Sequence, residues 1–277
     1  MSDDERYERL KSILARTGGA LVAFSGGVDS TLVAKAAADA LGERALAVTV
    51  RSKIHPRFEL DQARELAREI GIRHREIGAE PLEIEQFRAN PPERCYICKK
   101  ALFSKLLEVA REEGLAAVVE GSNVSDEGDY RPGMRALEEL EVRSPLREAG
   151  LEKPDVRELS RLLGLPTHDR PAYACLATRI PHGEEITAEK LAAIERAEEF
   201  LRERGYRVLR VRCHGDAARI ELGAEELMRF AEKEDFAEVA EGIRRAGFRY
   251  AALDLEGYRT GSMNPPGRGG PPPGPPA

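Results

Sequence analysis

The sequence predicts an α/β fold in which a parallel sheet is covered by helices on both faces and is followed by a smaller α+β domain. Three observations support this prediction. Short apolar runs alternate with helical patterns over the first part of the chain, a Ser-Gly-Gly turn joins the first apolar run to an alanine-rich helix, and the pattern changes near residue 184. With 277 residues, 42% of them hydrophobic, the chain is long enough to bury a core in each domain.

The first predicted strand, an apolar run, ends in a turn that is suited to bind phosphate. Gly26 and Gly27 allow the backbone to turn sharply, and a helical pattern begins directly after them. The first N–H groups of that helix have no partners within the helix, so an anion is their natural ligand. Ser25 and Ser30 can add hydroxyl hydrogen bonds, and Asp29 can hold Mg²⁺ between phosphates. The alternative is an ordinary turn between a strand and a helix.

The remaining elements of the first domain extend this pattern. Strands are expected at residues 45–50, 73–77 and 117–120, and helices at residues 7–16, 58–70, 95–113 and 154–163. Ligands of such sheets bind beyond the carboxyl ends of the strands. Arg51 should therefore flank the bound nucleotide, and the loop at residues 121–133 should belong to the same site. A solvated loop is the alternative for Arg51, and ordinary Asn/Asp turn chemistry is the alternative for the loop at residues 121–133.

The four cysteines favour chemistry over disulfides in a chain expected to lie in a reducing compartment. Cys95 and Cys98 form a Cys-x-x-Cys at the start of a predicted helix, which suits a metal, a cluster or redox chemistry, or is a chemically quiet pair. One such pair cannot make a four-cysteine zinc site from two pairs. Cys175 lies between Arg170 and Arg179, whose charges would favour its thiolate; a buried structural cysteine is the alternative.

The segment after residue 184 predicts the smaller domain. A helix is expected at residues 188–204, strands at 207–213, 219–222 and 250–255, and one helical stretch at 224–246. Strand alternation places Arg210 and Arg212 on one face, which suits phosphate or is a solvated face. Cys213 is expected in the core, and His214 with Glu221 could bind metal, although a structural histidine is the more common case.

Composition limits the remaining function classes. No apolar stretch is long enough to span a bilayer, and the polar first residues do not resemble a signal peptide, so a cytoplasmic protein is expected. The net charge of −6 weighs against nucleic acid as a partner. Residues 265–277, made mostly of proline and glycine, are expected to be a disordered tail.

Six motifs carry a resemblance that covers the chain almost to residue 264. The Ser-Gly-Gly-Val-Asp-Ser turn resembles the pyrophosphate loop of the PP-loop ATP pyrophosphatase superfamily, whose members cleave ATP between the α and β phosphates. With the other five motifs it makes the chain similar to the LarE family of ATP-dependent sulfur transferases. The motifs lie at residues 25–30, 94–99, 120–123, 171–179, 214–221 and 257–264.

The resemblance implies a function in the biosynthesis of the nickel-pincer nucleotide cofactor of lactate racemase. Family members use ATP and Mg²⁺ to adenylate a carboxylate of pyridinium-3,5-biscarboxylic acid mononucleotide, and a cysteine then displaces AMP. In the sacrificial version this cysteine, here Cys175, loses its sulfur and becomes dehydroalanine. The resemblance also implies a homo-oligomer and a nickel-insertion enzyme that receives the product.

The resemblance further implies roles for individual residues. Domains are expected at residues 1–168 (adenylation), 169–264 (sulfur transfer and substrate phosphate) and 265–277 (tail). ATP would be bound by Ser25, Gly26, Gly27, Asp29, Ser30, Arg51, Gly121 and Asn123, with Mg²⁺ on Asp29. The substrate would be bound by Arg179, Arg212, Arg259 and Asp126, with Asp129 and Arg131 as further candidates in the same loop.

The residues also fit other members of the family and the superfamily. Some family members carry a [4Fe-4S] cluster, for which Cys95, Cys98 and Cys175 would be the ligands. Related superfamily members thiolate tRNA, and others are ammonia-dependent ligases of the NAD-synthetase type that need no cysteine. A regulatory protein that binds a nucleotide without turning it over is the alternative outside the enzymes.

Overall fold

The computed structural model describes residues 2–126, 132–171, 174–259 and 263, which form two compact units. The N-terminal unit comprises Met1–Pro81 and Glu93–Tyr173, and the C-terminal unit comprises Leu82–Pro92 and Ala174–Ala277. The domain boundary expected near residue 168 stays a prediction. Asp129, Arg131 and the tail lie outside the described residues.

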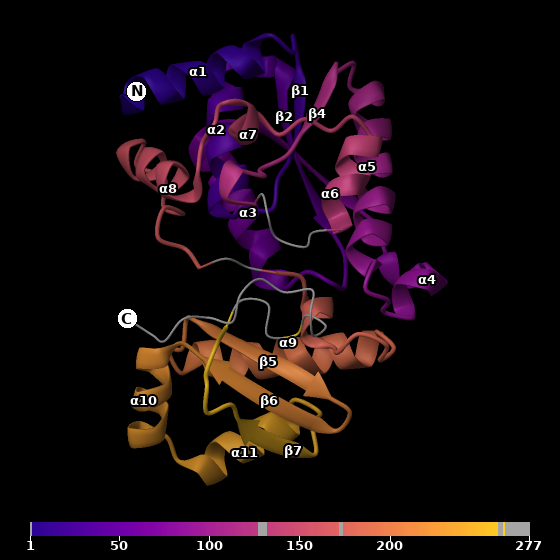
Figure 1. The fold of residues 1–277 in the computed structure, drawn as a ribbon, viewed down its shortest axis with the longest axis vertical. Coiled ribbons are helices and arrows are strands. Elements are labelled where there is room, and N and C mark those ends of the chain that lie inside the picture. The colour runs from indigo at the N-terminus through magenta and orange to yellow at the C-terminus, as the bar shows by residue number, and fades with distance from the viewer. Residues whose placement is uncertain (1, 127–131, 172–173, 260–262, 264–277) are drawn as a thin grey trace. The chain divides into compact units, whose positions relative to one another are not determined.

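The N-terminal unit (Figure 1) is built on a four-stranded parallel sheet. Its strands lie in the order β3-β2-β1-β4. The strands are β1 (Ala20–Ala23), β2 (Ala45–Arg51), β3 (Arg73–Gly78) and β4 (Ala117–Val119). The helices are α1 (Asp3–Ala15), α2 (Val28–Leu41), α3 (Arg57–Ile70), α5 (Arg94–Glu112), α6 (Pro132–Glu139), α7 (Pro145–Glu148) and α8 (Lys153–Leu162). This arrangement confirms the predicted α/β class.

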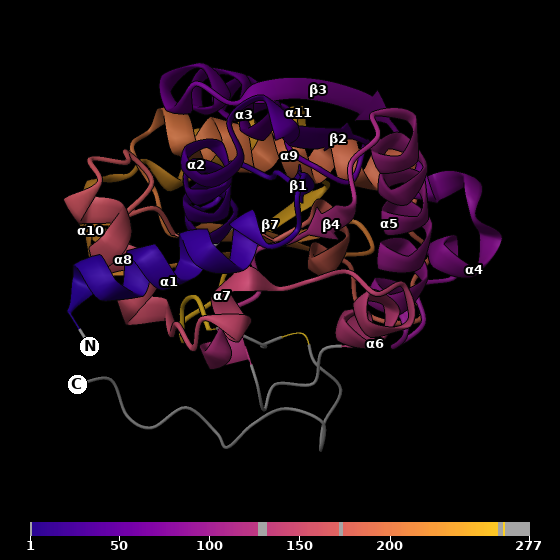
Figure 2. The ribbon, with the colours of Figure 1, turned by 90° about the horizontal axis from the view of Figure 1, so that it is seen from above.

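Alternation along the strands divides the core between the two faces of the sheet. Val22 and Ala47 pack with residues of α1, α2, α3, α7 and α8. Leu21 and Val48 face the other way and pack with α5 and α6. Figure 2 shows α2 and α5 on opposite sides of β1 and β4. The apolar runs are therefore strands buried on both faces, as a parallel sheet requires.

The C-terminal unit has a three-stranded mixed sheet in the order β5-β6-β7. Strands β5 (Leu209–His214) and β6 (Ala217–Leu222) are antiparallel, and β7 (Tyr250–Leu253) runs parallel to β6. The helices are α4 (Glu85–Arg88), α9 (Ala188–Glu203), α10 (Ala224–Lys233) and α11 (Phe236–Arg245). The predicted α+β character of this part is confirmed.

Residues 82–92 join the C-terminal unit through Asn90, which is fully buried and has a φ of 54°. Its side-chain amide donates to the carbonyl oxygens of Ile180 (3.3 Å), Pro181 (2.7 Å) and Glu184 (2.9 Å). The backbone N–H of Gly183 donates to the Asn90 carbonyl (2.9 Å). One asparagine therefore fixes the segment that follows residue 179.

Two sequence predictions of secondary structure were wrong. The stretch at residues 224–246 is two helices, because the Asp235 carboxylate accepts from the N–H groups of Ala237 (2.8 Å) and Glu238 (3.2 Å) and so caps a new helix. The loop expected up to residue 133 is already helical at Pro132, where α6 begins. Among the described residues, no helix is long and apolar enough to cross a membrane.

Candidate functional site

The turn between β1 and α2 has the geometry that suits phosphate binding. Gly26 adopts a φ of 74°, which favours glycine, and Gly27 is the N-cap of α2 and brings no side chain to the helix N-terminus. The hydroxyl oxygens of Ser25 and Ser30 lie 3.0 Å apart, and Ser30 Oγ also donates to the Gly27 carbonyl (3.2 Å). The turn is thus preorganised, with the first N–H groups of α2 turned toward its opening.

The loop after β4 lies directly against this turn. A Cβ atom on Gly121 would lie 2.9 Å from the backbone N of Ser30 and 3.0 Å from Asp29 Cβ, so only glycine fits there. The Asn123 side-chain amide donates to Asp29 Oδ1 (3.0 Å). The structure therefore brings Ser25, Gly26, Gly27, Asp29, Ser30, Gly121 and Asn123 together, as expected.

Asp29 has a second partner that the sequence did not indicate. Lys153, the first residue of α8, places its Nζ 2.5 Å from Asp29 Oδ2. The backbone N–H of Lys153 donates to Ser125 Oγ (2.9 Å), which ties α8 to the loop after β4. No local pattern marks Lys153, because its role depends on contact with a residue 124 positions away.

These residues fit ATP and Mg²⁺. A glycine-lined turn, an uncapped helix N-terminus and an ammonium group suit a triphosphate, and the Asp29 carboxylate is an oxygen ligand of the kind that Mg²⁺ prefers. Lys153 now neutralises the same carboxylate that would hold the metal. Asp29 would hold the metal ion, and Lys153 would place its ammonium group beside the phosphates.

Arg170 and Arg51 differ in where they point. Arg170 Nη1 lies 3.1 Å from Gln62 Oε1 and 3.5 Å from the Gly26 carbonyl oxygen, so this arginine belongs to the phosphate turn. The sequence predicts in addition that Arg170 favours the thiolate of Cys175, and that role stays a prediction. Arg51 stands at the end of β2, and its Nε lies 3.5 Å from Glu76 Oε2 on the neighbouring strand. Its role toward ATP stays a prediction.

The Cys-x-x-Cys lies in the first turns of α5, as predicted, with Cys95 partly exposed and Cys98 buried. Within the described residues, no group of three or more His, Cys, Asp or Glu side chains is arranged to hold a metal ion. Asp126 Oδ2 accepts from the Asn123 N–H (3.0 Å), an arrangement that closes its own turn. A role of Asp126 toward substrate stays a prediction.

Cys175 is partly exposed and immediately precedes a short 3₁₀ turn, η4 (Leu176–Arg179). Arg179 is fully buried, and its Nη1 donates to the carbonyl oxygens of Ala174 (2.5 Å) and Cys175 (3.0 Å). Its Nε and Nη2 donate to Glu198 (2.8 and 3.1 Å). These hydrogen bonds of Arg179 hold the backbone around the cysteine, which sequence proximity could not indicate.

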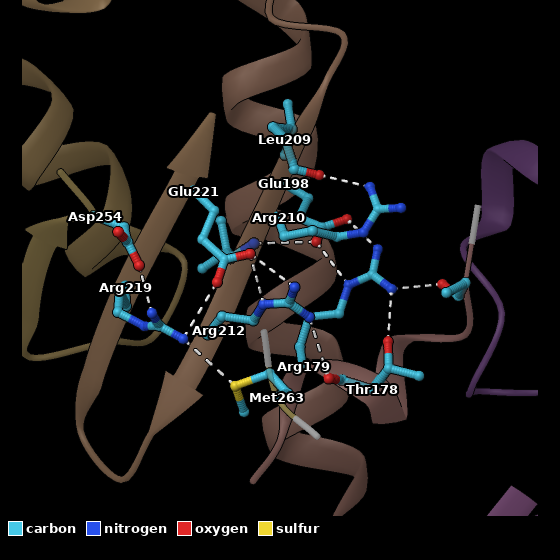
Figure 3. Close-up of polar contacts among 12 residues, drawn as sticks. Thr178, Arg179, Glu198, Leu209, Arg210, Arg212, Arg219, Glu221, Asp254 and Met263 are labelled. Atoms are coloured by element: carbon cyan, nitrogen blue, oxygen red, sulfur yellow. Dashed lines mark hydrogen bonds and ion pairs between the residues drawn. The ribbon is translucent and has the colours of Figure 1, made fainter. Parts of the chain in front are cut away.

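An arginine cluster, of which Arg179, Arg210 and Arg212 are buried, contacts this turn (Figure 3). Arg212 donates through Nε and Nη2 to Glu221 Oε2 (2.9 and 2.7 Å) and through Nη1 to the Thr178 carbonyl (3.2 Å). Arg219 also pairs with Glu221 (3.2 Å). Arg210 is buried, and burial together with the charge of Arg179 lowers the pKa of its guanidinium. The alternative prediction, that Arg210 and Arg212 lie on a solvated strand face, is therefore wrong.

The cluster combines several arginines with the fully buried carboxylates of Glu198 and Glu221. Burial would raise the pKa of Glu198, but the positive charges of Arg179, Arg202 and Arg210 outweigh this effect and lower it, so the carboxylate is ionised. Among the residues that the structure describes, the cluster contains Arg179, Arg202, Arg210, Arg212 and Arg219 together with Glu198, Glu221 and Asp254. Such an environment suits an anionic ligand.

The structure also shows the surroundings of three further residues that the sequence singled out. Arg259 pairs with the exposed Glu256 (2.5 Å). His214 Nε2 accepts from Arg219 Nε (3.2 Å), and burial and the charge of Arg219 lower the pKa of this histidine. Within the described residues, His214 and Glu221 belong to no group of three or more side chains arranged to hold a metal ion. Cys213 is buried as predicted, and burial raises the pKa of its thiol.

Comparison with known proteins places the chain in a family. The family model described as NAD synthase matches residues 7–94. The chain is 43% identical to the uncharacterized protein slr1717 of Synechocystis sp., over 94% of this chain and 97% of that one. It is 40% identical to pyridinium-3,5-bisthiocarboxylic acid mononucleotide synthase of Lactiplantibacillus plantarum, over 88% of each chain. It is 30% identical to the uncharacterized protein MJ0830 of Methanocaldococcus jannaschii, over 87% of this chain and 90% of that one. The chain therefore belongs to the pyridinium-3,5-bisthiocarboxylic acid mononucleotide synthase family, the LarE family, and has a phosphate-loop domain of the NAD synthase type.

Proposed function

We propose that this protein is an ATP-dependent sulfur transferase that converts a carboxylate of pyridinium-3,5-biscarboxylic acid mononucleotide into a thiocarboxylate, with Cys175 as the sulfur source. The observation that carries the proposal is the partly exposed Cys175, whose backbone is fixed by the buried Arg179, in a chain that also has a turn suited to phosphate binding. The relationship to a synthase of the corresponding bisthiocarboxylic acid supports the choice of substrate.

The first step is adenylation at the phosphate turn. A carboxylate oxygen of the substrate attacks the α-phosphorus of ATP, pyrophosphate leaves, and an acyl adenylate forms. Gly26, Gly27 and the N-terminus of α2 would bind the departing pyrophosphate. Asp29 would hold Mg²⁺, which neutralises phosphate charge when bound, and Lys153 is the nearest ammonium group.

The second step is thioester formation at Cys175. The thiolate attacks the acyl carbon, AMP leaves, and the substrate becomes attached through Sγ. Arg212 and the buried cluster would attract the phosphate of the mononucleotide, although Arg212 is already engaged by Glu221. Cleavage of the Cβ–Sγ bond then releases the thiocarboxylate and leaves dehydroalanine at position 175.

Sulfur insertion by a [4Fe-4S] cluster is the second candidate, and the Cys95/Cys98 pair is the observation that favours it. Cys95 and Cys98 belong to the N-terminal unit and Cys175 to the C-terminal unit, and no step is assigned to a cluster. Cytoplasmic location, a homo-oligomeric state and transfer of the product to a nickel-insertion enzyme are further parts of the proposal.

The deciding experiment is a mass spectrum of the peptide around Cys175 before and after incubation with ATP, Mg²⁺ and the biscarboxylate mononucleotide. Loss of H₂S at position 175 together with thiocarboxylate product supports the sacrificial reaction. The double variant Cys95→Ser/Cys98→Ser should still give this result, while Cys175→Ser should release pyrophosphate without forming product. Product formed with an unchanged Cys175 would refute the sacrificial reaction and support sulfur insertion by a cluster. Absence of pyrophosphate release would refute both candidates.

A further inference from the structure

The carbonyl oxygen of Cys175 accepts hydrogen bonds from three donors. They are the backbone N–H of Thr178 (3.0 Å), the hydroxyl of Thr178 (2.8 Å) and Nη1 of Arg179 (3.0 Å). A 3₁₀ turn by itself supplies only the first of these donors. The hydroxyl and the guanidinium are additional, and both come from the turn that begins directly after the cysteine.

The additional donors are held in place. The Arg179 side chain is 1% exposed, and Glu198, which fixes its Nε and Nη2, is fully buried. Nη1 of Arg179 carries two hydrogens and lies within reach of three acceptors, which share them: the carbonyl oxygens of Ala174 (2.5 Å) and Cys175 (3.0 Å) and the Thr178 hydroxyl oxygen (3.1 Å). The Thr178 hydroxyl in turn donates to the Cys175 carbonyl. Donation into a hydroxyl strengthens the hydrogen bond that the same hydroxyl donates. Figure 3 shows Thr178 and Arg179 side by side in this network.

We propose that these three donors form an oxyanion hole for Cys175 itself, which stabilises the enolate formed when its substrate thioester is cleaved. A general base, either solvent or a side chain, removes the Cα proton of Cys175, and the electron pair moves onto the Cys175 carbonyl oxygen. When the carbonyl reforms, the pair makes the Cα=Cβ bond and the Cβ–Sγ bond breaks. Sulfur leaves with the acyl group as a thiocarboxylate, and the proton stays on the base.

This inference rests on the proposed function, because the leaving group is the thioester that the function creates. The physical reason is that a peptide Cα–H is a weak acid, so the negative charge on the carbonyl oxygen is the main obstacle to elimination. Donors aimed in advance at the atom where charge develops lower that barrier, and loss of one such donor typically slows a reaction by about 10²–10³-fold. The donors that fix the turn therefore also act on the reacting residue.

The first test compares Thr178→Val with wild-type protein in a rapid-quench experiment read by intact mass. With ATP, Mg²⁺ and the biscarboxylate mononucleotide, Thr178→Val should release pyrophosphate at the wild-type rate and accumulate the Cys175 thioester. Its conversion to dehydroalanine should be slower by about 10²-fold. Thr178→Ser should restore the rate. Thr187→Ala, which removes the side-chain cap of α9 in the same unit, controls for a general loss of stability and should eliminate normally. Elimination at the wild-type rate in Thr178→Val would overturn the proposal.

A second test does not need the natural substrate. A bis-alkylating dibromide converts an accessible thiol into a cyclic sulfonium, which eliminates to dehydroalanine once a base removes the Cα proton. Cys95 is also partly exposed and serves as the internal reference. In folded wild-type protein the sulfonium at position 175 should eliminate faster than that at position 95, and both Thr178→Val and urea should abolish the difference. Equal rates in folded wild-type protein would refute the oxyanion hole. A faster rate at position 175 without any thioester in the first test would refute the proposed function and leave the oxyanion hole supported.

Discussion

Glu198→Gln tests whether one carboxylate holds the buried arginine cluster together. Glu198 Oε1 accepts from Arg179 Nε (2.8 Å) and the Val211 N–H (3.1 Å). Its Oε2 accepts from Arg179 Nη2 (3.1 Å) and Arg202 Nη2 (2.7 Å). An amide keeps one oxygen, so whichever way it turns, two of these four donors lose their acceptor and meet an N–H group instead.

The magnitude follows from those two lost contacts. At least one of them comes from a guanidinium, and a hydrogen bond to a charged group is worth about 1.5–3 kcal/mol. The substitution also leaves buried positive charge without its counterion, and breaking a buried pair in this way costs about 3–5 kcal/mol. We expect the free energy of unfolding of the C-terminal unit to fall by about 3–5 kcal/mol.

Amide hydrogen exchange in β5 and β6 measures this change. A loss of that size should make the most protected amides exchange roughly 10²–10⁴-fold faster. Glu241→Gln is the matched control, because Glu241 forms a surface ion pair with Arg244 (2.8 Å), with side chains 50% and 51% exposed. That change should cost less than about 0.5 kcal/mol. A loss below about 1 kcal/mol for Glu198→Gln would refute the view that Glu198 carries the cluster.

Three further predictions concern the N-terminal unit. Lys153→Met should slow pyrophosphate release and raise the KM for ATP by about tenfold or more, because it removes the ammonium beside the phosphate turn; unchanged ATP kinetics would contradict this. Gly121→Ala should cost about 1–3 kcal/mol in urea unfolding and weaken ATP binding, since its Cβ would lie 2.9 Å from the backbone of α2. Gly78→Ala, which meets open space, should be neutral, and equal losses in both variants would contradict the clash. Burial lowers the pKa of His55 and His74 in the folded protein. Near and below the ordinary histidine pKa of about 6.5, the unfolded chain therefore binds more protons than the folded protein does. Stability should therefore fall as pH falls from about 7.5 to 5.5 and change less in His74→Asn, as urea titrations at several pH values would test; a flat profile in the wild type would contradict it.

Local patterns predicted the elements that depend on neighbouring residues. The strand, the glycine turn and the helix at residues 20–41 follow from short-range chemistry, and the structure has all three. The shared face of Arg210 and Arg212 follows from the period of a strand. The break before α11 depends on a single cap at Asp235, which periodicity does not detect.

Long-range contacts account for what the sequence could not predict. Lys153 reaches Asp29 across 124 positions, and no feature around Lys153 distinguishes it from other lysines at helix starts. Arg210 and Arg212 are buried because Glu198 and Glu221 come from other elements to compensate their charge. Burial of charge is decided by such partners, and a strand pattern alone reports only the side of the sheet.

The C-terminal unit is built from two separate stretches of the chain, and this limits how the gene can recombine. The segment with Asn90 is separated from the carbonyl groups that Asn90 binds by a stretch that belongs to the N-terminal unit. A single recombination point therefore cannot exchange one unit intact, because a cut at residue 173 would leave Asn90 with the wrong partner. Chimeras of two related genes should keep a folded C-terminal unit only when residues 82–92 come from the same parent as residues 174–259. The parts of the gene that encode the two units therefore have to be inherited together, although each unit has a core of its own.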